Sequence, residues 1–399
     1  MAFLRTAGAF GVTLSASFSA SAAPLAAVPA VPAAYAAPVP AAYAAAVPAA
    51  YAAPISRADC GCWRVVQPEG ALPDSTLGEV TTPADDASWA AGSVGEAPLL
   101  LGWNGHRWRE KRTPLPADTL LEGVSAISAK EAWAVGLGKD GTGRTAHLSG
   151  AKWVKGSLTG GLPVVPRAVE ARTPDEAWVV GSTGGIAGNR AAAWRWNGRA
   201  WANVPVRTGS GGNSELMAVS ARSGEDAWAV GSSAPARQLL MRWNGKAWKS
   251  VKAPELQGET TLADVAALES GEAWAVGTIS PGPAGSASEV PLAERWDGKA
   301  WTAVEVPGVN GRFYSVAGDG GTGVWAAGED DSAHPLLAHW DGIRWDVSRP
   351  ALPTGAGQGE VWAVSHIPGT PYLRAVGWYG RPGEKQRHAV TWTNSPRPR

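Results

Sequence analysis

The sequence predicts an all-β protein in which seven repeats of four antiparallel strands close into a ring. Three observations carry this prediction. A Trp-Ala-Val-Gly segment or a near variant recurs every 44 to 51 residues, a Trp-Asn/Asp-Gly-x-x-Trp motif follows most copies, and 50 Gly and 31 Pro residues interrupt the chain too often for long helices. Short apolar runs bounded by Gly, Asn and Asp are typical of strands joined by hairpins.

The N-terminal part precedes the repeats. Residues 1–22 are typical of a signal peptide, because Arg5 precedes a mildly apolar stretch and Ala20-Ser21-Ala22 has the pattern of a cleavage site. Residues 23–57 repeat VPAAYAA, and their Pro content favours an extended stalk or a flexible tail over a packed core. No later run reaches the roughly 18 apolar residues that a membrane-spanning helix needs. We therefore expect a secreted protein, extracellular or associated with the cell wall.

The ring is expected over residues 58–396. The Trp of the first motif defines a second strand (B) in each repeat, and a constant Val nine or ten residues earlier defines an inner strand (A). The Asn/Asp-Gly hairpin joins a third strand (C) to an outer one (D). The seventh repeat has Arg374 in place of the Trp and stops after its third strand, whereas Trp63 lies one period before Trp108. We expect this N-terminal strand to complete the last repeat and close the ring.

The regular tryptophans are interpreted as structural. Those that flank a short C–D hairpin should share one face of the sheet and pair across it. A four-stranded sheet cannot bury both faces alone, so each repeat should pack against the next. We expect such packing roles for Trp63, Trp89, Trp108, Trp133, Trp178, Trp228, Trp274 and Trp325.

These repeats resemble those of secreted bacterial seven-bladed β-propellers, and the resemblance covers residues 60–395. It implies a disc of seven blades that presents ligand sites at one end. The Gly-x-x-Trp end of the motif also looks like the Asp-box of sialidase-type repeats and of photosystem II assembly-factor propellers. However, the Ser-x-Asp-x-Gly spacing of the Asp-box is missing, and so is the Gly-Gly doublet of kelch repeats. Likeness to these two classes is therefore loose.

Composition and motifs argue against several functions. With 35 basic and 35 acidic residues, the chain has no net charge to attract nucleic acid. The six His residues form no zinc motif, and no Gly-x-Ser-x-Gly sequence occurs. We expect no catalytic residue, metal or cofactor. Acids two residues before the B-strand Trp suit turn chemistry better than Ca²⁺ binding, namely Glu131, Glu176, Asp226 and Glu272.

The variable segments indicate where a ligand would bind. The B–C and D–A connections vary in length, and in a meander both lie at the same end of the blade. Arg190, Arg237 and His334 precede their C strands and suggest an arc of basic groups, although acids in the same loops also fit a mixed, solvated rim. Trp378-Tyr379-Gly380-Arg381 is expected in a loop, where two aromatic rings beside an Arg suit recognition of a sugar or a peptide. Packing of Trp378 on the disc is the alternative.

Two further features leave alternatives open. Glu79 and Asp264 lie beside the constant Val of inner strands, but four blades separate them and a close carboxylate pair is not expected. Cys60 and Cys62 are two residues apart, which on a strand is the upper distance limit for a disulfide, so a bridge between them would be strained. The alternatives are a cross-link between two chains or a bend of the chain at this point. The favoured hypothesis is a monomeric, non-catalytic propeller that binds a glycan, a peptide or a cell-surface protein. The alternatives are an extracellular polysaccharide or peptide lyase or hydrolase that uses rim and channel residues, and a purely structural envelope protein.

Overall fold

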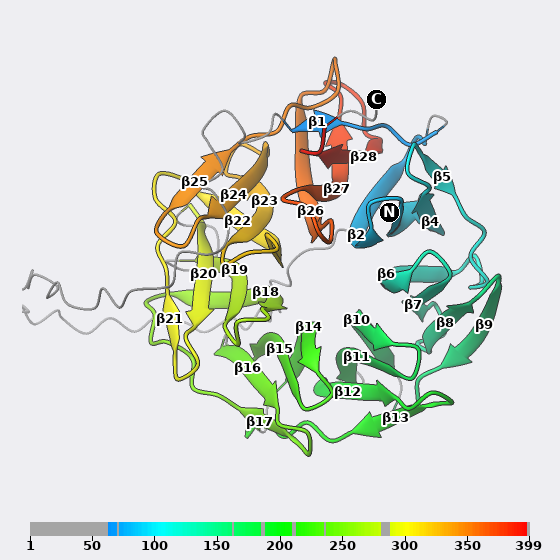
Figure 1. The fold of residues 1–399 in the computed structure, drawn as a ribbon, viewed down its shortest axis with the longest axis vertical. Coiled ribbons are helices and arrows are strands. Elements are labelled where there is room, and N and C mark those ends of the chain that lie inside the picture. The colour runs from blue at the N-terminus through cyan, green and yellow to red at the C-terminus, as the bar shows by residue number, and fades with distance from the viewer. Residues whose placement is uncertain are drawn as a thin grey trace, which may run out of the picture. The chain divides into compact units, whose positions relative to one another are not determined.

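The computed structural model describes residues 63–69, 72–161, 163–184, 188–209, 213–234, 237–280 and 288–396. The predicted signal peptide and stalk, Cys60 and Cys62 lie outside these residues. The described chain contains strands and no helix, and the strands form seven four-stranded antiparallel sheets around a central opening (Figure 1). The predicted all-β, seven-bladed β-propeller is therefore confirmed.

Each blade is a meander of four strands, ordered from the innermost strand (A) to the outermost strand (D). Blades 1 to 3 are β2 (Ser75–Ala84), β3 (Ala87–Val94), β4 (Ala97–Trp103), β5 (Trp108–Glu110); β6 (Thr119–Ser128), β7 (Glu131–Gly138), β8 (Gly143–Ser149), β9 (Lys152–Ser157); and β10 (Val164–Thr173), β11 (Glu176–Thr183), β12 (Arg190–Trp196), β13 (Trp201–Val204). Blades 4 and 5 are β14 (Ser214–Ser223), β15 (Asp226–Ser233), β16 (Arg237–Trp243), β17 (Trp248–Ser250); and β18 (Glu259–Ala267), β19 (Ala273–Ser280), β20 (Val290–Trp296), β21 (Trp301–Ala303). Blade 6 is β22 (Gly311–Gly318), β23 (Val324–Asp330), β24 (Pro335–Trp340), β25 (Trp345–Ser348).

Blade 7 combines the two ends of the described chain. Its first three strands are β26 (Gln358–His366), β27 (Leu373–Gly380) and β28 (Arg387–Thr393), and β1 (Arg64–Val65) pairs with β28 as the outer strand. The Val66 N–H donates to Thr391 O at 2.8 Å and extends this short pairing. The N-terminal segment thus supplies the strand that the seventh repeat lacks.

The hydrophobic core lies between the blades. Seven apolar clusters are described, one at each interface, and tryptophans connect neighbouring blades. Trp178 of blade 3 lies 5.0 Å from Trp243 and 5.1 Å from Trp248 of blade 4, ring centroid to centroid. Edge-on pairs of this kind add roughly 0.5–1.5 kcal/mol each to the burial of apolar area.

The repeated motifs have local explanations. In the C–D hairpin of blade 4, the Asn244 side chain accepts from the N–H groups of Lys246 and Ala247 at 3.1 and 3.0 Å, and Gly245 has a φ of 83°. In the B strand, a Cβ on Gly231 would lie 2.0 Å from Glu215 O of the paired inner strand, next to the bulge between Leu216 and Ala218. The Gly of Trp-Ala-Val-Gly is therefore a packing requirement.

Candidate functional site

The B–C and D–A connections share one face of the ring, which we call the loop face. Hydrogen bonds join them directly: Gly95 N–H donates to Asp74 O at 2.6 Å, and Ala234 N–H donates to Asn213 O at 2.7 Å. The A–B and C–D turns lie at the opposite end of each meander. The most variable segments of the sequence therefore lie together on the loop face.

Three of the expected ligand residues lie on separate blades of the loop face. Arg190 and Arg237 are the exposed first residues of β12 and β16. His334 lies between β23 and β24, with its Nδ1 3.5 Å from an Asp330 carboxylate oxygen. These residues do not form one cluster, and a binding role for them stays a prediction.

Trp378 and Tyr379 do not lie in the loop where we expected them. Both belong to β27 and are buried, at 3 % and 6 % exposure, because the strand continues to Gly380. The Trp378 ring is edge-on to Trp362, and the Arg387 guanidinium lies 4.0 Å from its centroid. Trp378 is thus part of the packing of blade 7.

Tyr379 and Arg381 meet at a cleft on the loop face of blade 7. Its volume is about 360 Å³, within the range of small-ligand sites. The segments on either side of the blade contribute apolar walls, and the polar groups come from the segment before β2, from the B–C loop and from β28. The walls are Pro68, Leu72, Pro73, Pro353 and Ala389, and the polar groups are Gln67, Arg381 and His388. We refer to this site as the blade 7 cleft.

One carboxylate lies between the Arg381 guanidinium and the His388 ring of the cleft. Glu384 lies 3.0 Å from His388 Nε2 and 3.7 Å from an Arg381 guanidinium nitrogen. The hydrogen bond from His388 and the charge of Arg381 lower the pKa of Glu384. His388 also stacks on Tyr379 at 5.0 Å, and Arg381 lies over the same ring at 5.9 Å.

A second cluster of polar side chains lies where strands β22, β23 and β26 approach the loop face. The Tyr314 hydroxyl donates to Glu329 at 2.6 Å, and Arg312 lies 3.5 Å from the same carboxylate. Burial and the nearby charge of Glu360 raise the pKa of Glu329 to about 7. Trp362 donates its indole N–H to Glu360. The sequence gives no signal for this cluster, because its members belong to two blades and match no motif.

The inner strands carry a set of acidic side chains contributed by three blades. Glu79, Asp264 and Glu170 interact electrostatically across three blades, and burial together with these two other charges raises the pKa of Glu170 to about 8. The Asp264 carboxylate also accepts the Val316 N–H of the next blade at 2.9 Å. Ser125 and Ser220 make the same kind of bond, to Ala171 and Ala267. Polar groups of the inner strands therefore join the blades.

The recurrent acids before the B-strand Trp make ion pairs across the B–C hairpin. Glu176 lies 2.7 Å from Arg195, and Asp226 lies 2.9 Å from Arg242. Both arginines also lie over the neighbouring Trp rings.

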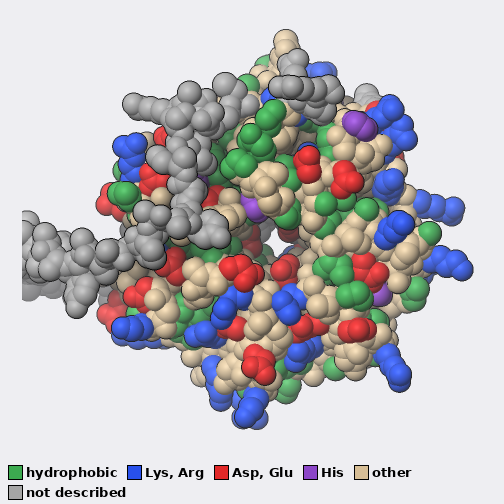
Figure 2. All heavy atoms as spheres, viewed as in Figure 1, with side chains coloured by type: hydrophobic (Ala, Val, Ile, Leu, Met, Phe, Trp, Pro, Cys, Tyr) green, Lys and Arg blue, Asp and Glu red, His purple; other side chains and the backbone are tan. Residues whose placement is uncertain are grey.

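Figure 2 shows basic and acidic side chains interleaved around the central opening. Among the described residues, no group of three or more His, Cys, Asp or Glu is suited to hold a metal.

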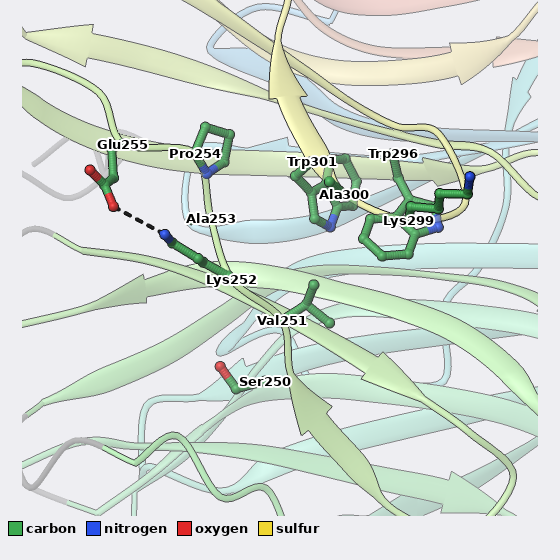
Figure 3. A pocket seen from close by; sticks show the side chains of 10 residues that line it. All are labelled: Ser250, Val251, Lys252, Ala253, Pro254, Glu255, Trp296, Lys299, Ala300 and Trp301. Atoms are coloured by element: carbon green, nitrogen blue, oxygen red, sulfur yellow. Dashed lines mark hydrogen bonds and ion pairs between the residues drawn. The ribbon is translucent and has the colours of Figure 1, made fainter.

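A larger and more open groove of about 580 Å³ lies between blades 4 and 5. Figure 3 shows the 250–255 segment on one side and Trp296, Lys299 and Trp301 on the other, with Lys252 paired to Glu255 at 3.1 Å. Trp296 and Trp301 are only 6 % and 4 % exposed. This groove therefore offers no open aromatic face and no group of converging polar atoms.

Comparison with known proteins identifies the fold and nothing finer. No protein-family model and no curated protein match the sequence. Similar solved structures include YCF48 bound to D1 peptide, with 16% identity, a TM-score of 0.57 and coverage of 88% of this chain and 100% of that one. YCF48 from Cyanidioschyzon merolae has 16% identity, a TM-score of 0.54 and coverage of 83% and 98%. The GH74 enzyme of Niastella koreensis has 11% identity, a TM-score of 0.55 and coverage of 79% and 52%.

These identities support a shared propeller fold alone. One of these structures is a peptide complex and another is an enzyme, so a similar ring does not by itself indicate a function. In the part of the chain that the structure describes, no helix has the length and apolar character needed to cross a membrane.

Proposed function

We propose that this protein is a secreted binding protein that holds a short peptide segment of an extracellular or cell-surface partner in the blade 7 cleft. The observation that carries the proposal is the cleft itself. It combines apolar walls with three polar side chains, Gln67, Arg381 and His388, on the face that holds the variable loops. This combination is typical of sites that bury a ligand and fix its orientation with few polar contacts.

The environment of Tyr379 favours a peptide over a sugar. Sugar recognition by stacking needs an open aromatic face, whereas Tyr379 is 6 % exposed and already has His388 stacked on it. The proline-rich walls suit an extended chain, since Pro and Leu side chains can contact alternate side chains of such a ligand. A YCF48 propeller has been solved with D1 peptide bound. That example motivates the choice of ligand class but places no ligand on this chain.

The test is peptide selection on the wild type, followed by a comparison of the affinities of two variants. Phage-displayed peptides are selected on the full chain, and the affinity of the best sequences is measured by fluorescence anisotropy. Gln67→Trp fills the mouth of the cleft from an exposed position. Ile343→Trp is the matched control, because Ile343 is 85 % exposed in the C–D turn of blade 6, on the opposite face.

We expect Gln67→Trp to weaken binding at least tenfold and Ile343→Trp to leave it unchanged. Equal binding by both variants would remove the cleft as the site. Failure to select any peptide, together with enrichment of this protein on extracellular polysaccharide, would favour the glycan alternative.

A second function is favoured by one observation. Glu329 lies toward the loop face, and its pKa is raised to about 7. A carboxyl group with this pKa can act as a general acid or base near neutral pH. Hydrolysis or lyase cleavage of an extracellular polymer would follow if a substrate reached it. Turnover of cell-wall polymers that Glu329→Gln abolishes supports this function, and absence of turnover by the wild-type protein argues against it.

A further inference from the structure

A single turn places a carboxylate between Arg381 and His388 of the blade 7 cleft. The turn follows β27, and the Glu384 N–H donates to Arg381 O at 3.1 Å, which brings both side chains to the same side. His388 enters from β28, and its Nε2 contacts the other Glu384 oxygen at 3.0 Å. Arg381 and His388 are thus already arranged around one carboxylate group.

We propose that a ligand carboxylate binds the same two side chains as Glu384, so that the peptide taken by the cleft is acidic and displaces Glu384 on binding. This inference rests on the proposed peptide-binding function and adds the chemical class of the ligand. Arg381 and His388 line the cleft, whereas Glu384 does not. An aspartate, a glutamate or a C-terminal carboxylate of the ligand could therefore reach both side chains from inside the cleft.

Displacement of Glu384 costs little free energy. Its side chain is 41% exposed, and Arg381 is 45% exposed. Ion pairs at such positions contribute little to stability, because water screens them and two side chains must be held in place. Gly383, at a φ of 82°, precedes Glu384 in the same exposed turn. A ligand carboxylate that enters the cleft would lie beside the buried Pro68 and Ala389, where charges interact more strongly than in open water.

A second acid beside the cleft, Glu69, does not compete for Arg381 and His388. Glu69 follows Pro68, but it pairs with Arg107 and with Arg109, the latter at 3.0 Å. Its hydrogen bond from Arg107 and the charges of both arginines lower its pKa. Glu384 is thus the residue whose removal leaves Arg381 and His388 without their carboxylate.

The experiment compares two synthetic probes on four proteins, with Gln67→Trp added to the wild type and to Glu384→Gln to show that binding occurs in the cleft. The probes are fluorescein-labelled octapeptide pools of mixed Pro, Leu and Ala residues with one central residue fixed as Glu or as Gln. The proteins are the full-length wild type, Glu384→Gln, Arg381→Gln and Glu255→Gln. Glu255 is the matched control, because it is an exposed acid paired to Lys252 on the other side of the ring and its replacement makes the same change in charge.

We expect the wild type to prefer the Glu pool, and Glu384→Gln to bind that pool roughly two- to fivefold more tightly, the fold-change that corresponds to loss of one exposed ion pair. Arg381→Gln should lose the preference, and Glu255→Gln should match the wild type. Equal binding of both pools by the wild type and by Glu384→Gln, abolished in each case by Gln67→Trp, overturns the inference while leaving the peptide-binding function in place.

If neither pool binds, acetate serves as the minimal carboxylate probe. Acetate added to Glu384→Gln should shift the imidazole NMR signals of His388 saturably, and chloride at the same ionic strength should not. Unshifted His388 signals in acetate overturn the inference.

Discussion

Replacement of Glu294 by Gln should make the ring more stable at neutral pH and remove part of its pH dependence. Glu294 lies in β20 of blade 5 and is fully buried, with one carboxylate oxygen accepting the Gln238 amide of blade 4 at 2.7 Å. The other oxygen, Oε2, and Gln238 Oε1 have no hydrogen-bond partner. A protonated Glu294 relieves this shortage, because its O–H adds a donor to the pair.

The magnitude follows from the pKa. Burial raises the pKa of Glu294 from 4.5 to about 7. Between these values the native state binds more protons than the unfolded state, so the free energy of unfolding falls as pH rises. The loss is complete above pH 7 and amounts to about 3 kcal/mol for a shift of this size. Below pH 4.5 both states are protonated and the group contributes no pH dependence.

Urea unfolding of the wild type and of Glu294→Gln at pH 5, 6, 7 and 8 measures this effect. The stability of the variant relative to the wild type should rise with pH through this range and reach its largest value near pH 8. Glu255→Gln, an exposed substitution with the same change in charge, should show no such trend. A difference between Glu294→Gln and the wild type that is constant from pH 5 to pH 8 would refute a raised pKa at Glu294.

Three further predictions concern packing and closure. Gly231→Ala should destabilise the protein by roughly 2 kcal/mol or more in urea unfolding, since its Cβ would meet Glu215 O, whereas Gly161→Ala, with no atom within 4 Å, should be neutral; equal effects would contradict the packing argument. Arg374→Met should lower the melting temperature by several degrees, because it removes the guanidinium that lies 4.4 Å from the Trp103 ring and donates to Asp85 O at 2.7 Å; an unchanged melting temperature would show that this contact contributes nothing. Deletion of residues 60–69 should lower the melting temperature in circular dichroism because blade 7 loses β1, and an unchanged value would contradict closure by this strand.

The fold could be predicted because it depends on local, repeated chemistry. The Asn244-Gly245 pair encodes a hairpin by itself, since the Asn side chain satisfies two turn N–H groups and the Gly adopts a positive φ. The missing fourth strand of the last repeat could be read from the spacing between Trp63 and Trp108 alone. Because the same pattern recurs seven times, an error in the predicted bounds of one strand does not change the predicted fold.

The site could not be predicted to the same degree because it depends on where strands end and on which loops meet. Trp378 follows the Gly that ends the B-strand motif, where the variable B–C segment is expected, but pairing with β28 extends β27 to Gly380. The blade 7 cleft joins Gln67 to Arg381 and His388, which are more than 300 residues away in the sequence, and only ring closure brings them together. Likewise, the pKa of Glu329 depends on Glu360 of the next blade, and nothing in a single repeat indicates that charge.

Hydrogen–deuterium exchange with and without a selected peptide tests the binding site most directly. We predict slower exchange in residues 66–69, 72–74 and 379–389, which include the loop-face edge of the blade 7 cleft, and no change in the C–D turns on the opposite face. Protection confined to residues 297–300 and 250–255, at the groove between blades 4 and 5, would contradict the assignment of ligand binding to the blade 7 cleft.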